Sequence, residues 1–248
     1  MSTLTEYANR FETVRLERQD GVLQVTIHNR GGEAVWDATE TSLHHELGLA
    51  FREIAEDLEN RVVILTGAGD AFCAVSDITA VGLNTPEGWD RILREGQALI
   101  RNLLDIPVPV IGAVNGPALY HAELVVMSDI VLASDQAQFA DLSHVPDDIV
   151  PGDGVQVWWP MLLGPNRGRY FLLMGERIDA RDALALGIVG EVLPHDQLNA
   201  RAWEIARKLA AKPPRMLRHT RAVLTQHLRR RMADALHHGL ALEGLAAL

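Results

Sequence analysis

The 248-residue chain carries 33 acidic and 23 basic side chains, which gives a formal net charge of -10. With 48% hydrophobic residues it can bury one sizeable core. Because the basic residues are scattered and the net charge is negative, we expect no nucleic-acid partner. No stretch approaches the ~20 apolar residues of a membrane helix, and the N-terminal residues lack the apolar run of a signal peptide, so we expect no membrane partner.

The single cysteine, Cys73, excludes an intramolecular disulfide bond. A chain without disulfides suits a reducing compartment, so the expected location is the cytoplasm. We interpret Cys73 as a small packed side chain rather than a nucleophile.

The first two thirds of the sequence predict strands that alternate with helices. The runs Val14–Gln19 and Val22–His28 flank Asp20-Gly21, a dipeptide that favours a tight hairpin turn. This alternation is typical of an α/β fold with sites at the carboxyl ends of its strands. Further strands are expected at Arg61–Thr66, Val110–Val114 and Asp129–Ser134, and helices at about Thr41–Leu58 and Glu87–Leu104, from near His121, and at Pro165–Met174 and Ala180–Leu186.

From Gln197 onward the pattern is helical almost throughout, and Pro213-Pro214 starts a new helix. The tail Leu228–Leu248 carries apolar residues at helical spacing, so it should pack on the core or on a neighbouring subunit. We therefore divide the chain into a core of residues 1–195 and a C-terminal helical region of residues 196–248, which we expect to serve assembly and to cover the active site.

Three segments resemble the crotonase (enoyl-CoA hydratase) superfamily, and they occur in the order of that family. They are RVVILTGAGDAFCAVSDI (Arg61–Ile78), IPVPVIGAVNGPALYHAELVVMSDIVLAS (Ile106–Ser134), and the stretch from Phe139 through VPGDG and GPNRGRYFLLMGERIDARDALALGIVGEVLP. The resemblance implies an α/β fold with a ββα spiral core, a C-terminal helical trimerisation region, and a homotrimer or dimer of trimers. It also implies an oxyanion hole of two backbone N–H groups, one at Ser76 and one at Tyr120 or His121.

Departures from the family pattern indicate a different reaction. The hydratases that these segments resemble carry a glycine run and a pair of glutamates. This chain lacks the glycine run and keeps only one of the two glutamates, Glu123. The remaining polar residues resemble, position by position, the 6-oxocamphor hydrolase branch, which cleaves cyclic β-diketones by a retro-Claisen reaction. The residues that carry this likeness are His121, His144, Asp153 and Glu243, with Trp36 as a pocket tryptophan; we assign His44 to the same substrate pocket.

Hydrolysis of a β-diketone needs an activated water, an oxyanion site and an acid for the enolate. We predict His144 as the general base, with Asp153 holding its tautomer. His121 is predicted to bind a carbonyl or enolate oxygen and to be oriented by Glu243. The expected partner is therefore a small cyclic diketone.

Two other functions stay open at this point. The first is an acyl-CoA hydratase, isomerase or hydrolase that uses Glu123, and the second is a catalytically silent assembly subunit. No cofactor is expected, because phosphate-loop and dinucleotide patterns are absent. No metal is expected either, because His44, His45 and Glu46 do not form HExxH, and no G-x-S-x-G motif supplies a serine nucleophile.

Overall fold

The computed structural model describes residues 3–39, 41–78 and 85–248. The chain begins with helix α1 (Leu4–Tyr7) and the antiparallel strands β1 (Val14–Gln19) and β2 (Val22–Ile27). The two turn residues, Asp20 and Gly21, have φ angles of 52° and 80°, as a two-residue type I′ turn requires. The predicted hairpin is confirmed.

The main sheet has six strands in the order β1-β2-β4-β6-β7-β10. Every pair after the first hairpin is parallel, which confirms the predicted α/β class. The four later strands are β4 (Val62–Gly67), β6 (Val110–Val114), β7 (Ile130–Ser134) and β10 (Glu191–Leu193). Two small sheets pair β3 (Val35–Trp36) with β5 (Val75–Ser76), and β8 (Gln138–Phe139) with β9 (Ile178–Asp179).

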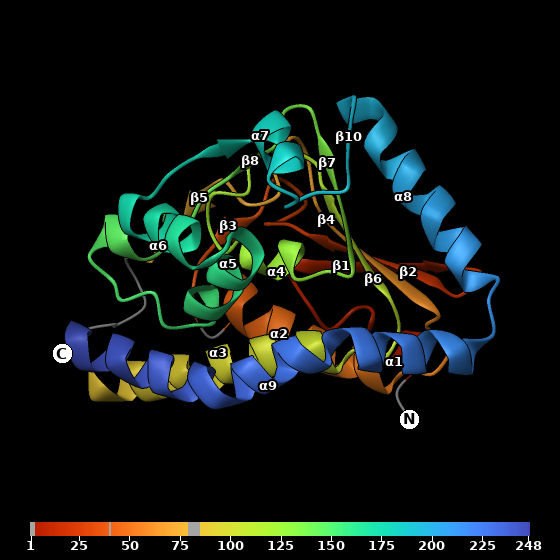
Figure 1. The fold of residues 1–248 in the computed structure, drawn as a ribbon. Coiled ribbons are helices and arrows are strands. Elements are labelled where there is room, and N and C mark those ends of the chain that lie inside the picture. Colours follow the sequence, from red (N-terminus) through yellow and green to blue (C-terminus); the bar gives the residue numbers. More distant parts are fainter. Residues whose placement is uncertain (1–2, 40, 79–84) are drawn as a thin grey trace.

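Helices connect and cover these strands (Figure 1). They are α2 (Leu43–Glu56), α3 (Pro86–Asp105), α4 (Glu123–Val126), the 3-10 turn η1 (Val145–Asp147), α5 (Val155–Leu163), α6 (Pro165–Met174), α7 (Ala180–Ala185), α8 (His195–Ala210) and α9 (Pro214–Ala247). Helix α5 was not predicted, because Pro160 inside it and the turn-forming VPGDG before it both argue against a helix there. The two-stranded pairs also escaped prediction, because two residues carry no period.

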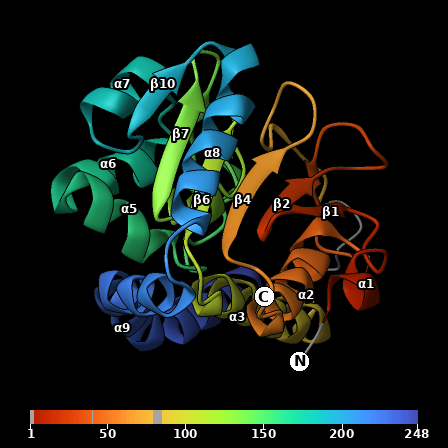
Figure 2. The same ribbon diagram turned by 90° about the vertical axis from the view of Figure 1, so that its right-hand side faces the viewer.

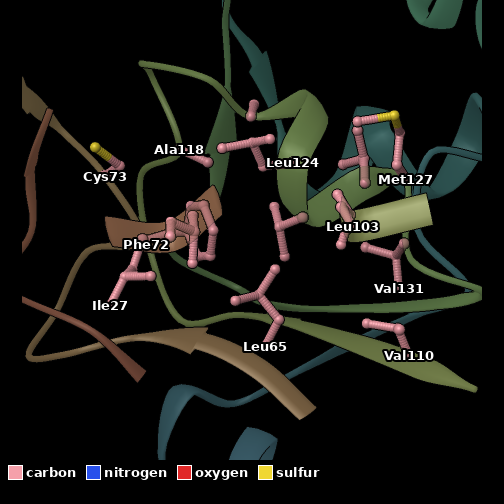
Figure 3. Packing of buried hydrophobic residues seen from close by; sticks show 14 of the residues in the cluster. Ile27, Leu65, Phe72, Cys73, Leu103, Val110, Ala118, Leu124, Met127 and Val131 are labelled. Atoms are coloured by element: carbon pink, nitrogen blue, oxygen red, sulfur yellow. The ribbon is translucent and has the colours of Figure 1, made fainter. Parts of the chain in front are cut away.

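Both faces of the main sheet are buried. In β4, Val62 and Ile64 pack against α8, whereas Val63 and Leu65 face the larger core. Figure 2 shows α8 lying across β4 and β6, and Figure 3 shows part of the larger core, where Leu65 lies among Phe72, Leu103 and Val110. Burial on both faces explains why this strand reads as a continuous apolar run instead of an alternating one.

The long helix α9 runs beside α3 (Figure 1) and buries Leu228, Met232, Leu236 and Leu240 in the larger core. The predicted boundary after residue 195 falls at the start of α8, which packs on the sheet. Apolar side chains remain exposed on α6 and α9, among them Leu173, Met174, Val223 and Leu224, and assembly into a trimer or hexamer stays a prediction. Among the described residues, no helix has the length and apolar character to span a membrane.

A buried arginine attaches α9 to the core. The guanidinium of Arg221 is 2% exposed and donates to Asp129 Oδ2 at 2.7 Å. It also donates to the carbonyl oxygens of Leu104, at 3.0 Å, and of Ile106. These acceptors end α3 and begin β7, so one side chain joins three parts of the chain.

We expect Arg221→Met to lower the free energy of unfolding by about 3–5 kcal/mol, because Asp129 would keep a partly buried charge without its partner. Urea denaturation followed by circular dichroism measures this change. The matched control is Arg230→Met on the exposed side of the same helix, where we expect less than about 0.5 kcal/mol. Equal effects of the two substitutions would contradict the anchoring role.

Candidate active site

A cavity with an empty volume of about 560 Å³, part of it open to solvent, lies between α2, α3, α9 and the loops that follow β8. Its lining combines apolar walls with a small group of ionisable residues. The lining residues are Trp36, Ala38, His44, Ser76, Ile78, Trp89, Ile92, His121, Ser143, His144, Asp147, Ile149, Asp153, Leu240 and Glu243. The cavity therefore brings together seven of the eight residues predicted for the diketone site; Tyr120 is the exception, and Glu123 also lies outside the lining.

His121 lies between two carboxylates. Its Nδ1 is 2.9 Å from Glu123 Oε1 and 3.0 Å from Asp153 Oδ2. Burial alone would lower the pKa of His121, but the charges of Glu123 and Asp153 outweigh burial and raise this pKa well above its usual value. These two carboxylates therefore favour the protonated, imidazolium form of the ring. The predicted orienting residue, Glu243, is not the partner: among the described residues it makes no hydrogen bond to His121.

His144 is also held by two carboxylates. Its Nδ1 is 2.7 Å from Asp141 Oδ1, and its Nε2 is 3.4 Å from Asp153 Oδ1. Burial lowers the pKa of His144, but the charges of Asp153 and Asp141, with the hydrogen bond to Asp141, raise it to about 9. The predicted contact between His144 and Asp153 exists, but it is longer than the contact between His144 and Asp141.

Asp153 lies between the two imidazoles, whose ring centroids are 5.7 Å apart. Burial would raise its pKa, but His144 and His121 hold it well below its usual value. The loop that carries Asp153 crosses α9 at very short range, since a Cβ on Gly152 would collide with the carbonyl oxygen of Gly239. Glycine at both positions allows this crossing.

Glu243 reaches the same cavity from α9. It is 7% exposed, and its buried Oε2 has no hydrogen-bond partner among the residues that the structure describes. Burial and the charge of Asp153 raise the pKa of Glu243 to about 8, so this carboxyl group is largely protonated at pH 7. It can therefore act as an acid or as a hydrogen-bond donor.

The expected oxyanion donors differ in their availability. The Tyr120 N–H donates to the carbonyl of Cys73 at 3.2 Å, so it is occupied. His121 has a φ of 51°, a strained conformation for this residue, and its N–H has no acceptor in the described part of the chain. The Asp77 N–H donates to Trp36, so the Ser76 N–H points to the opposite edge of β5.

Aromatic rings support the histidines from one side. Trp36 stacks on His121 with ring centroids 3.8 Å apart and an interplanar angle of 27°. His44 meets the same indole edge-on at 5.7 Å, and its Nδ1 is 3.2 Å from Glu95 Oε2. An indole face stabilises an imidazolium by a cation–π interaction, so Trp36 favours the charged form of His121.

Sequence reasoning missed Asp141, Glu95, Trp89 and Ser143. Trp89 and Ser143 line the cavity, and their buried Nε1 and Oγ atoms have no hydrogen-bond partner within residues 3–39, 41–78 and 85–248. Asp141 and His144 are three residues apart, which could have suggested a contact. In a loop, however, a spacing of three residues does not by itself bring two side chains together. The His121 Nδ1 and one carboxylate oxygen each of Glu123 and Asp153 lie within 4.8 Å of one another, a spacing that a small metal site would need. One Nδ1–H shared between the two carboxylates also accounts for these distances.

The sequence and the fold both match known proteins. The model of the enoyl-CoA hydratase/isomerase family matches residues 17–244. Enoyl-CoA delta isomerase 2 of Homo sapiens is 29% identical over 92% of this chain, which spans only 57% of the human protein. A probable enoyl-CoA hydratase of Rhodobacter capsulatus is 31% identical over 79% of this chain and 76% of its own length.

Among solved structures, a β-diketone hydrolase from the cyanobacterium Anabaena sp. PCC 7120, bound to (S)-3-oxocyclohexyl acetic acid, is 46% identical with a TM-score of 0.94. The match covers 98% of this chain and 96% of that structure. An enoyl-CoA hydratase/isomerase from Mycobacterium paratuberculosis is 28% identical with a TM-score of 0.85, over 95% and 94% of the two chains. The chain therefore belongs to the enoyl-CoA hydratase/isomerase family and has the crotonase fold.

Proposed function

We propose that this enzyme hydrolyses a carbon–carbon bond of cyclic β-diketones by a retro-Claisen reaction. The observation that carries the proposal is the pair of buried imidazoles that share Asp153 inside an apolar cavity. Such a pair supplies a base and an acid at one site, where water can be activated and an enolate protonated. The likeness to the Anabaena β-diketone hydrolase supports the same reaction.

The cavity suits a compact alicyclic molecule with few polar atoms. Trp36, Ile92 and Leu240 supply apolar surface for a ring, and the unpartnered Trp89 Nε1 and Ser143 Oγ can donate to carbonyl oxygens. Joining the carboxyl carbon of (S)-3-oxocyclohexyl acetic acid to the ring carbon that lies beside the ketone and opposite the side chain, with loss of water, gives bicyclo[2.2.2]octane-2,6-dione. We therefore take this bicyclic diketone as the first substrate to test.

In the proposed mechanism His144 Nε2 takes a proton from water as the water oxygen attacks one carbonyl carbon. The backbone N–H groups of Ser76 and His121 stabilise the tetrahedral oxyanion. The bond between that carbon and the α-carbon then breaks, and its electron pair becomes the enolate of the second ketone. His121 Nε2–H binds the enolate oxygen, and protonated Glu243 supplies an acid for the α-carbon, which gives a keto acid.

Acyl-CoA chemistry is the second candidate, because the curated relatives named above are enoyl-CoA enzymes. Two features argue against it. Glu123 bonds His121 Nδ1, is 1% exposed and does not line the cavity, so it has no access to a substrate. None of the described lining residues is a lysine or an arginine, and these are the side chains that usually bind phosphate groups such as those of coenzyme A.

A silent assembly subunit fits the site less well. Among the described residues, Asp141, Glu123 and Glu243 each have a buried carboxyl oxygen without a hydrogen-bond partner, and such groups destabilise a fold. Their grouping around one cavity favours a catalytic role, because perturbed ionisable groups gather at functional sites.

We expect the purified enzyme to convert bicyclo[2.2.2]octane-2,6-dione to a keto acid without coenzyme A, metal or nucleotide. Gas chromatography of the acid and proton release at constant pH measure the reaction. A parallel assay with crotonyl-CoA tests the second candidate. Turnover of the thioester with no reaction across a panel of cyclic diketones would reject the proposal in favour of acyl-CoA chemistry.

The pH dependence follows from His144. Its pKa of about 9 means that the neutral, basic form grows as the pH rises toward that value. Protonated Glu243, with a pKa of about 8, is the proposed acid, so the same profile has a falling limb. We expect kcat/KM to increase about tenfold per pH unit below about pH 8, to level off, and to fall above about pH 9. Rates measured across this range test the sign: a fall in kcat/KM with rising pH below 8 would exclude His144 as the base.

His144→Ala should lower kcat by about 10²–10⁴-fold, the range for loss of one general base, and should abolish the rising limb of the pH profile. The control is His219→Ala, because His219 is exposed near the start of α9. This substitution should leave kcat and the pH profile unchanged. Steady-state kinetics on the accepted diketone decide the matter. Near-wild-type turnover by the His144 variant would remove it from the mechanism.

A further inference from the structure

We propose that Asp141 is a positioning residue that fixes the tautomer of His144, so that Nδ1 carries the proton and Nε2 faces the reacting water. The inference rests on the proposed function and adds to it a residue that the sequence did not suggest. It also gives Asp153 a different task, which is to bridge the two histidines.

The distances assign different partners to the two ring nitrogens of His144. Nδ1 is 2.7 Å from Asp141 Oδ1, the length of a charge-assisted hydrogen bond. Nε2 is 3.4 Å from Asp153 Oδ1, which is longer than a good N–H···O hydrogen bond. The side chains of Asp141 and His144 are only 1% and 2% exposed, so water does not compete for the shorter contact.

The backbone holds both partners in place. Around Asp141, the Ala140 N–H donates to Ala118 and the Leu142 N–H donates to Leu119. The carbonyl of His144 accepts from the N–H groups of Asp147 and Ile149, which closes the turn η1. The geometry of the Asp141–His144 pair is therefore set by main-chain bonds on either side of it.

The charge of Asp141 is a second reason to assign it as the partner of His144 Nδ1. Asp141 Oδ2 is buried and has no hydrogen-bond partner in the described part of the chain, where His144 is the group that hydrogen-bonds to this carboxylate and compensates its charge. The other ionisable groups around His144 are Asp153, His121 and Glu243. Asp153 also contacts His121 Nδ1 at 3.0 Å, whereas Asp141 has no ion pair except that with His144 among the described residues.

A carboxylate that accepts the Nδ1–H of a catalytic histidine keeps the Nε2 lone pair available and stabilises the imidazolium that forms when Nε2 takes a proton. Asp141 meets this description. Asp153 acts on the other nitrogen and on a second ring, so its loss should disturb both histidines.

The test is Asp141→Asn compared with Asp153→Asn, and Asp148→Asn on the nearby exposed loop is the control. We expect Asp141→Asn to lower kcat by about 10²–10⁴-fold, because the amide permits the wrong tautomer. KM should change little. Nitrogen-15 NMR of the imidazoles should show that the His144 pKa falls and that its neutral form loses the Nδ1–H tautomer, while His121 keeps its titration. In Asp153→Asn both histidines should shift, and Asp148→Asn should match the wild type.

Wild-type kcat and an unchanged His144 tautomer in Asp141→Asn would overturn the inference. If the Asn variant does not fold, Asp141→Glu decides, because it keeps the charge and changes the reach. We expect that variant to retain the Nδ1–H tautomer with a reduced kcat, and an Nε2–H tautomer would overturn the inference. If the wild type cleaves no diketone, the proposed function fails, while the NMR titrations still judge the role of Asp141.

Discussion

The site depends on a backbone crossing between the loop of Asp153 and the C-terminal helix α9. Gly152 and Gly239 meet with no room for a side chain on either, and Gly152 also lies against Glu243. This crossing brings Asp153 from the middle of the chain and Glu243 from its end to one cavity. Helix α9 is thus a wall of the site as well as an appendage on the core, and its attachment through Arg221 supports the site geometry.

The crossing places one carboxylate between two imidazoles, and this sharing controls the charges of the site. Asp153 is held ionised by His121 and His144, while the pKa values of both histidines are raised. Burial and the charge of Asp153 raise the pKa of Glu243 to about 8. Acidic and basic groups therefore coexist in a cavity with apolar walls, which is the condition for moving protons near neutral pH.

The scaffold around this cluster is that of the family. The Asn115 side chain accepts from the Gly67 N–H and donates to the carbonyls of Gly69 and Ala71, so the loops after β4 and β6 are tied together. The same region joins Cys73 to Ala118 and carries the backbone around Ser76 and His121. One fold can thus serve different reactions when the ionisable residues around its cavity change.

The sequence by itself determined the hairpin, the buried parallel strands, the long C-terminal helix and seven of the residues that line the cavity, because these follow from local turn chemistry, hydrophobic period and recognisable motifs. The tertiary structure alone decided the partners: His121 contacts Glu123 and Asp153 instead of Glu243, and Asp141 has the shorter contact with His144. Which carboxylate pairs with which histidine depends on differences of a few tenths of an ångström between donor–acceptor distances. Those distances are set by main-chain hydrogen bonds and close packing between remote segments, which no local pattern encodes.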